Sequence, residues 1–203
     1  MSDRALLASL FLPALRRIGA AIRDRVVAAC EAAETEALAR AEEDTTAQAG
    51  DTIYAVDRVS EAVLVEALER EIAVHLPIVL VAEGLAEGRM VLPRGTAEEL
   101  ARFRVIVDPI DGTRGLMYGK RSAWVLAGVA VERGAKTSLA DIELAVQTEI
   151  PTPKQHLADT LWAIAGQGAP GQRWDRVRGV ISAWTPRPSG ANTLEHGFAS
   201  VAR

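Results

Sequence analysis

The sequence predicts a layered α/β fold, because helical and strand patterns occupy different parts of the chain. Near the N-terminus, apolar residues recur at helical spacing with charged residues between them, which is typical of amphipathic helices. From residue 78 onward, short continuous apolar runs between glycine, proline and charged residues replace that pattern. The 203 residues are enough to bury a sizeable core, and we expect a single domain over 1–203.

Two helices are expected in the first third of the chain. The first begins near Pro13 and is expected to continue through Glu31–Glu43, and its apolar positions are Leu15, Ile18, Ile22 and Val26. Ser60 is a plausible N-cap for the second helix, which ends at Pro77 because proline cannot continue it. The apolar stripe of the second helix is Leu64, Leu68, Ile72 and Leu76.

The rest of the chain is expected to supply the sheet. Predicted strands are Ile78–Ala82, Phe103–Val107, Ala123–Val131, Asp141–Thr148, Thr160–Ala165 and a short Val180–Trp184. The first two are continuous apolar runs, which favours strands buried on both faces. Loops are expected over Leu85–Thr96 and over most of Gly166–Gly190, and a helix over Asn192–Ala202.

The charge, the cysteine content and the apolar runs of the chain limit the classes of function that are expected. There are 23 basic and 27 acidic residues, and the net charge of −4 argues against a broad nucleic-acid-binding surface. The single cysteine, Cys30, cannot form an internal disulfide and is expected to be a small buried hydrophobe. Ala5–Leu15 imitates a signal-peptide core, but Asp3 precedes it and no cleavage-like break follows, so the cytoplasm is expected. No apolar run has the length of a membrane span.

The stretch Val107–Thr113 carries the most chemical information. Asp108 and Asp111 flank Pro109 and Ile110 at the end of an apolar run, and Gly112-Thr113 follows. Carboxylates bind hard divalent cations, and backbone N–H groups of a tight turn can bind phosphate oxygens. The motif therefore indicates a metal-and-phosphate site. The alternative is a plain strand-to-turn connection, since these residues are all turn formers.

The order of the acidic segments resembles the inositol monophosphatase family of magnesium-dependent, lithium-sensitive phosphatases. The similarity consists of Asp51–Asp57 before a helix, an apolar strand ending in Glu83, and a second strand ending in Asp108–Thr113. Gly166–Ala169 also matches a later Gly-x-Gly-Ala turn of the family. The resemblance implies helices packed on a mixed, largely antiparallel sheet.

The resemblance also implies a role for each matching residue. Metal ligands would be Glu83, Asp108, Asp111 and the backbone carbonyl of Ile110, and the metal would be Mg²⁺. Thr113 would hold the attacking water, with Asp57 accepting a hydrogen bond from its hydroxyl. The N–H groups of Gly112 and Thr113 would bind the substrate phosphate.

Three departures from the family pattern bear on these roles. Gly84 stands where family members usually have a second glutamate, and Arg114–Met117 is closer to the 3′-phosphonucleotide phosphatase branch. Family chains also continue into a C-terminal part whose Trp-Asp motif supplies a further metal ligand. The pair Trp174-Asp175 lies in a different context and is not assigned that role. We therefore expect the family's C-terminal subdomain to be absent from these 203 residues.

Simpler interpretations remain open for individual residues. Asp57 is also a plausible helix cap, and Glu83 an exposed charge at a strand end. Lys120 and Arg121 follow the motif and would either neutralise a substrate phosphate or form a solvated turn, and the turn is favoured.

The leading functional hypothesis is a Mg²⁺-dependent phosphomonoesterase that hydrolyses an inositol phosphate, a sugar phosphate or a 3′-phosphonucleotide. The alternative is a non-catalytic homologue that binds metal or phosphate as an interaction module. A Rossmann-type nucleotide binder is disfavoured, because no Gly-x-Gly-x-x-Gly follows a strand. The expected partner is a small phosphorylated substrate, with no nucleic-acid polymer and no membrane. The expected assembly is a monomer or a homodimer.

Overall fold

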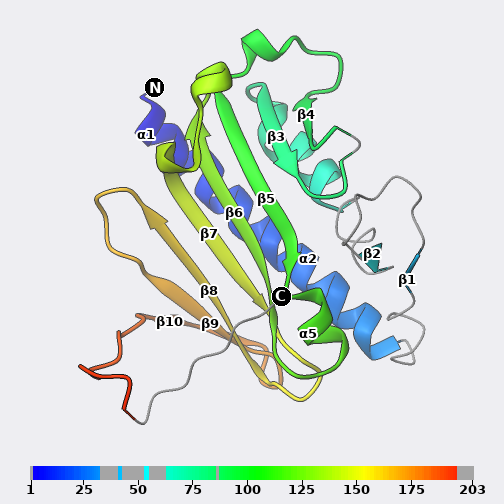
Figure 1. Ribbon diagram of the computed structural model, residues 1–203, viewed down its shortest axis with the longest axis vertical. Coiled ribbons are helices and arrows are strands. Elements are labelled where there is room, and N and C mark those ends of the chain that lie inside the picture. The colour runs from blue at the N-terminus through cyan, green and yellow to red at the C-terminus, as the bar shows by residue number, and fades with distance from the viewer. Residues whose placement is uncertain (1, 33–40, 43–52, 55–62, 86, 196–203) are drawn as a thin grey trace.

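An eight-stranded mixed sheet organises the fold (Figure 1). The computed structural model describes residues 2–32, 41–42, 53–54, 63–85 and 87–195. The strand order is β10-β9-β8-β7-β6-β5-β3-β4. Strands β3 and β5 pair in parallel, whereas the other neighbouring pairs in this sheet are antiparallel. The strands are β3 Ile78–Ala82, β4 Arg89–Leu92, β5 Phe103–Asp111, β6 Ala123–Val131, β7 Ile142–Ile150, β8 Leu157–Ile164, β9 Gly171–Asp175 and β10 Val180–Trp184.

A continuous N-terminal helical segment covers one face of this sheet, across β6 and β7 (Figure 1). It consists of α1 Asp3–Leu6, the π-helical turn η1 Leu7–Phe11 and α2 Leu12–Ala32. The Ser2 hydroxyl caps it by accepting a hydrogen bond from the Ala5 N–H at 3.3 Å. The helix thus begins ten residues before the expected Pro13, because the apolar segment that imitates a signal peptide is its buried first turns. Pro13 thus lies inside the continuous helical segment, directly after the π-helical turn Leu7–Phe11, where the regular α-helical hydrogen-bond pattern is already interrupted.

The expected extension of this helix to residue 43 is wrong at its end. Ala41–Glu42 forms the short strand β1, which pairs antiparallel with β2, Ile53–Tyr54. The helix is described to Ala32, and residues 33–40 lie outside the described residues. Alanine and glutamate are good helix formers, but intrinsic helix propensity is a small effect that pairing between strands can override.

By length and composition, the segment Asp3–Ala32 is sufficient to cross a membrane, which corrects the expectation that no run approaches that length. The apolar face of this helical segment, however, packs against the sheet. Phe11, Ile18 and Ile22 are almost fully buried against the sheet, and Phe11 contacts Phe103 of β5 with ring centroids 4.8 Å apart. Each such side chain contributes roughly 1.5–3 kcal/mol when it leaves water.

The second expected helix occupies residues 63–68 and continues as the π-helical turn η2, Glu69–Ala73. Three of its predicted stripe residues, Leu64, Leu68 and Ile72, are fully buried in the core, and Leu76 packs against that core. Ser60 lies outside the described residues. The burial of one helix face against the sheet confirms the amphipathic pattern.

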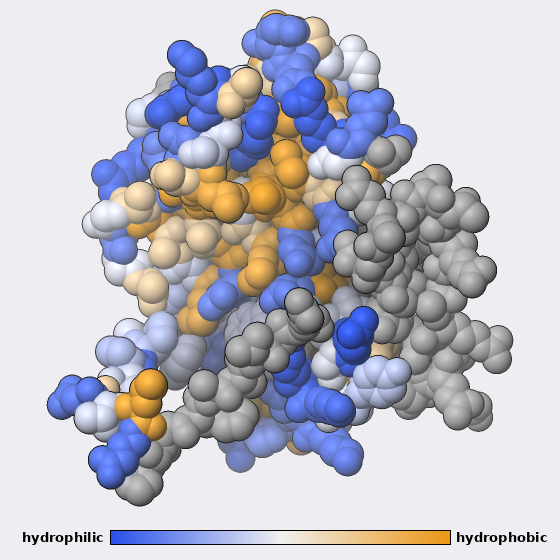
Figure 2. Space-filling model, viewed as in Figure 1, coloured by the Kyte–Doolittle hydropathy of each residue, from blue (hydrophilic) through white to orange (hydrophobic). Residues whose placement is uncertain are grey.

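The opposite face of the sheet remains partly open in the described part of the chain. β5 alternates between buried residues, such as Val105 and Val107, and more exposed ones, and Ile106 is 37% exposed. Figure 2 shows apolar side chains gathered on this face. The expectation that the strand Phe103–Val107 is buried on both faces is therefore wrong.

Several loop expectations also need correction. β4 lies within the expected loop Leu85–Thr96 and pairs with β3, while β9 lies within Gly166–Gly190 and pairs with β8 and β10. Residues 192–195 are not helical, although a helix was expected to begin there. The predicted strands Ile78–Ala82, Ala123–Val131 and Val180–Trp184 have the observed boundaries.

Candidate active site

The parallel pair β3–β5 sets the geometry of the candidate site. Ala82, the last residue of β3, pairs with Val107 of β5. The residues that follow are Glu83 and Asp108, so each of the two acids comes directly after the last residue pair of the parallel ladder. The carboxyl ends of parallel strands are where open α/β sheets gather ligand-binding groups. Glu83 is exposed and Asp108 is partly buried.

The strand continues past Asp108, farther than the sequence predicted. A register shift separates the pair Asp108–Leu126 from the pair Asp111–Trp124. Within this irregularity, the Ile110 N–H donates a hydrogen bond to Asp108 Oδ1 at 3.0 Å. Ile110 is buried, whereas Asp111 is exposed at the end of the strand. The Asp108 carboxylate therefore has a structural task as well as its predicted role in metal binding.

A tight turn follows at Gly112, whose φ of 93° lies in the left-handed region that glycine adopts without strain. Thr113 then begins the short helix α5, Thr113–Met117, which Leu116 and Met117 anchor in the core. The Thr113 hydroxyl donates a hydrogen bond to the Ile110 carbonyl oxygen at 2.9 Å. The motif is thus a fixed turn between buried elements.

The donor set is consistent with Mg²⁺ in its chemistry, because Glu83, Asp108 and Asp111 offer carboxylate oxygens and Ile110 offers a carbonyl oxygen. In the described ranges, no three acids, histidines or cysteines form a group arranged to hold a metal ion. The three acids are therefore near one another in the fold without forming a ready-made cluster. Asp57, the other predicted catalytic residue, lies outside the described residues.

Arg121 lies closer to this turn than the favoured prediction of a solvated turn implied. A Cβ atom added at Gly112 would lie 3.4 Å from an Arg121 guanidinium nitrogen, and one added at Gly115 would lie 2.7 Å from Arg121 Cγ. The side chain therefore extends along the two glycines. A glycine on the first turn of α5, where alanine is the better helix former, is the only signal in the sequence for this contact.

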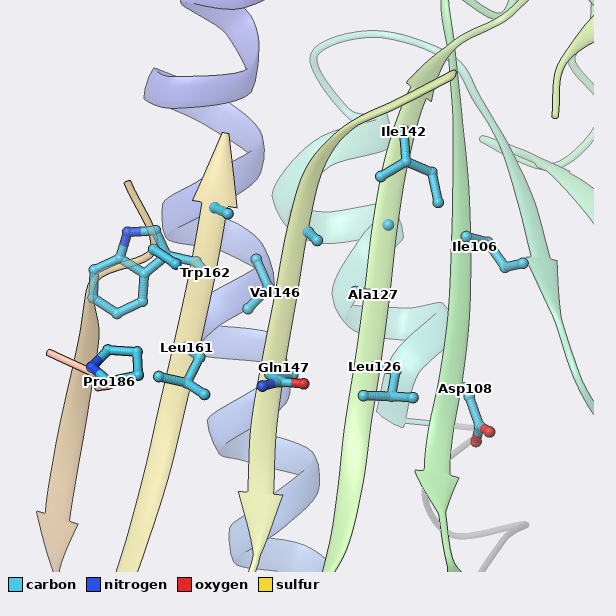
Figure 3. A pocket seen from close by; sticks show the side chains of 14 residues that line it. Ile106, Asp108, Leu126, Ala127, Ile142, Val146, Gln147, Leu161, Trp162 and Pro186 are labelled. Atoms are coloured by element: carbon cyan, nitrogen blue, oxygen red, sulfur yellow. The ribbon is translucent and has the colours of Figure 1, made fainter. Parts of the chain in front are cut away.

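The open face of the sheet carries an apolar pocket of about 610 Å³ beside the acidic turn (Figure 3). Asp108 lies at one end of this pocket, next to Leu126, and Trp162 and Pro186 lie at the other (Figure 3). The pocket is almost entirely apolar, so it does not by itself suit a phosphorylated group.

The Trp174-Asp175 pair makes contacts that shape this end of the sheet. Asp175 Oδ1 accepts hydrogen bonds from the N–H groups of Val177 and Arg178, at 3.1 and 3.0 Å, and so closes the β9–β10 hairpin. The Arg23 guanidinium lies 4.0 Å from the centre of a Trp174 ring. The contact with Arg23 joins the middle of α2 to β9.

The fold is similar to that of several solved structures. The chain matches a fructose-1,6-bisphosphatase from Leishmania major at 17% identity with a TM-score of 0.62, over 87% of this chain and 53% of that one. It matches the extragenic suppressor protein suhB from Bartonella henselae at 17% identity with a TM-score of 0.57, over 79% and 51%. A putative sedoheptulose-1,7-bisphosphatase from Toxoplasma gondii matches at 14% identity with a TM-score of 0.55, over 90% and 58%. These three likenesses show a shared fold over most of this chain.

The chain belongs to the inositol monophosphatase family, whose model matches residues 13–169. This confirms the resemblance and the fold class that it implied, an α/β fold with helices on a mixed sheet. The family is generally metal-dependent. Among curated proteins, none matches the sequence. The chain spans about half the length of the solved structures that it matches.

Proposed function

We propose that this chain carries the metal- and phosphate-binding part of a Mg²⁺-dependent phosphomonoesterase for a small phosphorylated alcohol. The substrate would be an inositol phosphate, a sugar phosphate or a 3′-phosphonucleotide. The observation that carries the proposal is the register of the parallel strands, because the pairing of Ala82 with Val107 sets Glu83 beside Asp108. The Asp111–Thr113 turn follows from the same strand.

Glu83, Asp108, Asp111 and the Ile110 carbonyl would hold Mg²⁺. When bound, the metal lowers the pKa of a coordinated water and neutralises charge on the departing oxygen. The Gly112 and Thr113 N–H groups would orient the phosphate. Such positioning is most of what phosphoryl transfer needs from a protein.

The Thr113 hydroxyl would control the attacking water. Its single proton can be given to one acceptor at a time, and the Ile110 carbonyl oxygen is an acceptor within reach, at 2.9 Å. Donation to Asp57 instead would release that carbonyl, a predicted metal ligand, and leave the Thr113 oxygen able to accept a hydrogen bond from water. Attack of the water oxygen on phosphorus then gives the free alcohol and inorganic phosphate.

The second candidate is a non-catalytic homologue that binds metal or phosphate. The observation in its favour is that, in the part of the chain that the structure describes, the acids do not form a group ready to hold a metal. Gly84 in place of the usual second glutamate points the same way. We further expect a cytoplasmic protein that binds neither nucleic acid nor membrane, as a monomer or a homodimer.

Phosphate release from a panel of small phosphomonoesters, with Mg²⁺ and with a chelator, tests the proposal. We expect turnover with Mg²⁺ that the chelator abolishes and Asp111→Asn strongly reduces. Turnover unaffected by the chelator would contradict the metal mechanism. Calorimetric Mg²⁺ binding without hydrolysis of any panel member would instead support the non-catalytic candidate.

A further inference from the structure

The Arg121 side chain has a defined place beside the Asp111–Thr113 turn. Its backbone N–H donates to the Gly115 carbonyl oxygen at 3.3 Å, and the Lys120 N–H donates to the same oxygen at 2.9 Å. These bonds fold the chain after α5 back over the turn. Arg121 therefore approaches Gly112 and Gly115 through its backbone path as well as its side chain.

Gly115 makes room for the arginine stem. A Cβ atom at residue 115 would lie 2.7 Å from Arg121 Cγ and 2.9 Å from Nε, closer than atoms can pack without movement. The absence of that Cβ lets the stem lie against α5. Because the stem is held there, less side-chain entropy is lost when the guanidinium binds a ligand.

The head group lies over Gly112. The central carbon and both terminal nitrogens of the guanidinium would lie 3.4–3.6 Å from a Cβ atom at that residue. Within the described residues, the guanidinium forms no hydrogen bond or ion pair with an acceptor. The Arg121 side chain is exposed beside the turn proposed to bind phosphate, so its N–H donors are accessible to a ligand there. The acids Asp108 and Asp111 lie in the same motif.

We propose that Arg121 is a substrate-positioning residue whose guanidinium holds non-bridging oxygens of the phosphoryl group bound at Gly112 and Thr113. The guanidinium is a planar fork that matches two phosphate oxygens, which an ammonium group cannot reproduce. This inference rests on the proposed phosphate site. It replaces the favoured expectation that Lys120 and Arg121 form only a solvated turn.

Kinetics of Arg121→Ala and Arg121→Lys with a small phosphomonoester and Mg²⁺ test the proposal. We expect KM and the inhibition constant of inorganic phosphate to rise about tenfold in Arg121→Ala, with a smaller change in kcat. Arg121→Lys should recover only part of this. Lys120→Ala is the matched control, since it removes the same charge from the neighbouring position, and should leave both constants unchanged.

The substitution Gly115→Ala tests whether the position of the Arg121 guanidinium matters as well as its charge. It keeps the guanidinium but displaces the stem, so it should raise KM in wild-type Arg121 and have little further effect in Arg121→Ala. Non-additivity of this kind is expected only if both changes act through one contact. Additive effects of the two substitutions would overturn the proposal.

Binding of inorganic phosphate, measured by calorimetry in Mg²⁺ buffer, distinguishes this inference from the proposed activity. If the wild-type chain does not hydrolyse esters but binds phosphate about tenfold more tightly than Arg121→Ala, the inference stands and the activity fails. If the wild type is active and Arg121→Ala behaves like Lys120→Ala, the inference fails alone. Absence of both hydrolysis and phosphate binding would overturn both.

Discussion

The carboxylate of Asp108 accepts a hydrogen bond from the Ile110 N–H, so a side chain that is predicted to bind metal also shapes the turn. The two tasks respond differently to substitution. An asparagine keeps an oxygen that can accept the bond but loses the charge, whereas an alanine loses both.

We therefore expect Asp108→Asn to lower Mg²⁺-dependent turnover by more than about a hundredfold while Tm changes by less than about 4 °C. Asp108→Ala should be equally inactive and less stable by a further ~1 kcal/mol, because the Ile110 N–H loses its acceptor. Enzyme assays and thermal melts measure both effects. Asp175→Asn is the matched control, since Asp175 also accepts backbone N–H bonds but lies at the β9–β10 hairpin. Near-normal turnover by Asp108→Asn would rule out the proposed metal role.

Metal binding should stabilise the fold, because bound cations relieve repulsion between the carboxylates at the ends of β3 and β5. At a Mg²⁺ concentration of about 100 times Kd, the expected gain is ~2.7 kcal/mol, visible as a rise in Tm. Glu83→Gln should reduce this rise. Glu99→Gln should not, since Glu99 lies on the 3-10 turn Glu98–Leu100 that precedes the opposite end of β5. Equal Mg²⁺ responses from the two variants would exclude Glu83 as a ligand.

The parts of the fold that the sequence predicts are those with strong local patterns. Ile78–Ala82 is a purely apolar run bounded by proline and glutamate, and its limits match β3. By contrast, β4 contains Met90 and Val91 between glycine and proline, and its strand character comes from pairing with β3. β9 begins at Gly171 and carries charged residues, so its strand depends on its neighbours β8 and β10. Pairing between distant segments is invisible to local propensity.

The candidate site likewise combines residues that a local sequence pattern predicts with a contact that depends on the fold. Glu83 and Asp108 were predicted because each directly follows an apolar run, and Asp111 because it completes the motif that begins at Asp108. For Arg121 the sequence favoured a solvated turn over a contact with phosphate, since its approach to the motif depends on the path of the chain after α5 and on the missing Cβ of Gly115. The roles of the acids stay predictions, and the experiments above test them.

Acid should weaken the turn before β7. The Ser138 hydroxyl and N–H both donate to Asp141 Oδ2, at 2.8 and 2.9 Å, and these bonds lower the pKa of the Asp141 carboxyl. A lowered pKa means that the carboxylate stabilises the fold above its unfolded pKa, and that this stabilisation is lost as pH falls through the folded value. Asp141→Asn should therefore be less stable than wild type near neutral pH, and the difference should shrink below about pH 4. Urea unfolding across this pH range measures it. A difference that stays constant with pH would contradict the assignment.

The last prediction concerns the contact between α2 and β7, which holds the helix on the sheet that carries the site. Gly19 of α2 faces Thr148 of β7 so closely that a Cβ atom at residue 19 would lie 2.5 Å from Thr148 Oγ1. Thr148 is 1% exposed, and its hydroxyl has no hydrogen-bond partner in the described part of the chain. The interface is thus tightly packed around a buried polar group.

We expect Gly19→Ala to lower the free energy of unfolding by about 1–3 kcal/mol, because the added methyl must displace Thr148 or the helix. Thr148→Val should raise it by ~1 kcal/mol, since valine has a similar shape without the unpaired hydroxyl. Gly168→Ala is the control for the glycine change, because a Cβ atom there would meet nothing within 4 Å. Urea denaturation gives all three values. In Thr148→Ala the cost of Gly19→Ala should fall, because the nearest atom is removed, and an undiminished cost would show that the helix backbone, not Thr148, resists the methyl group.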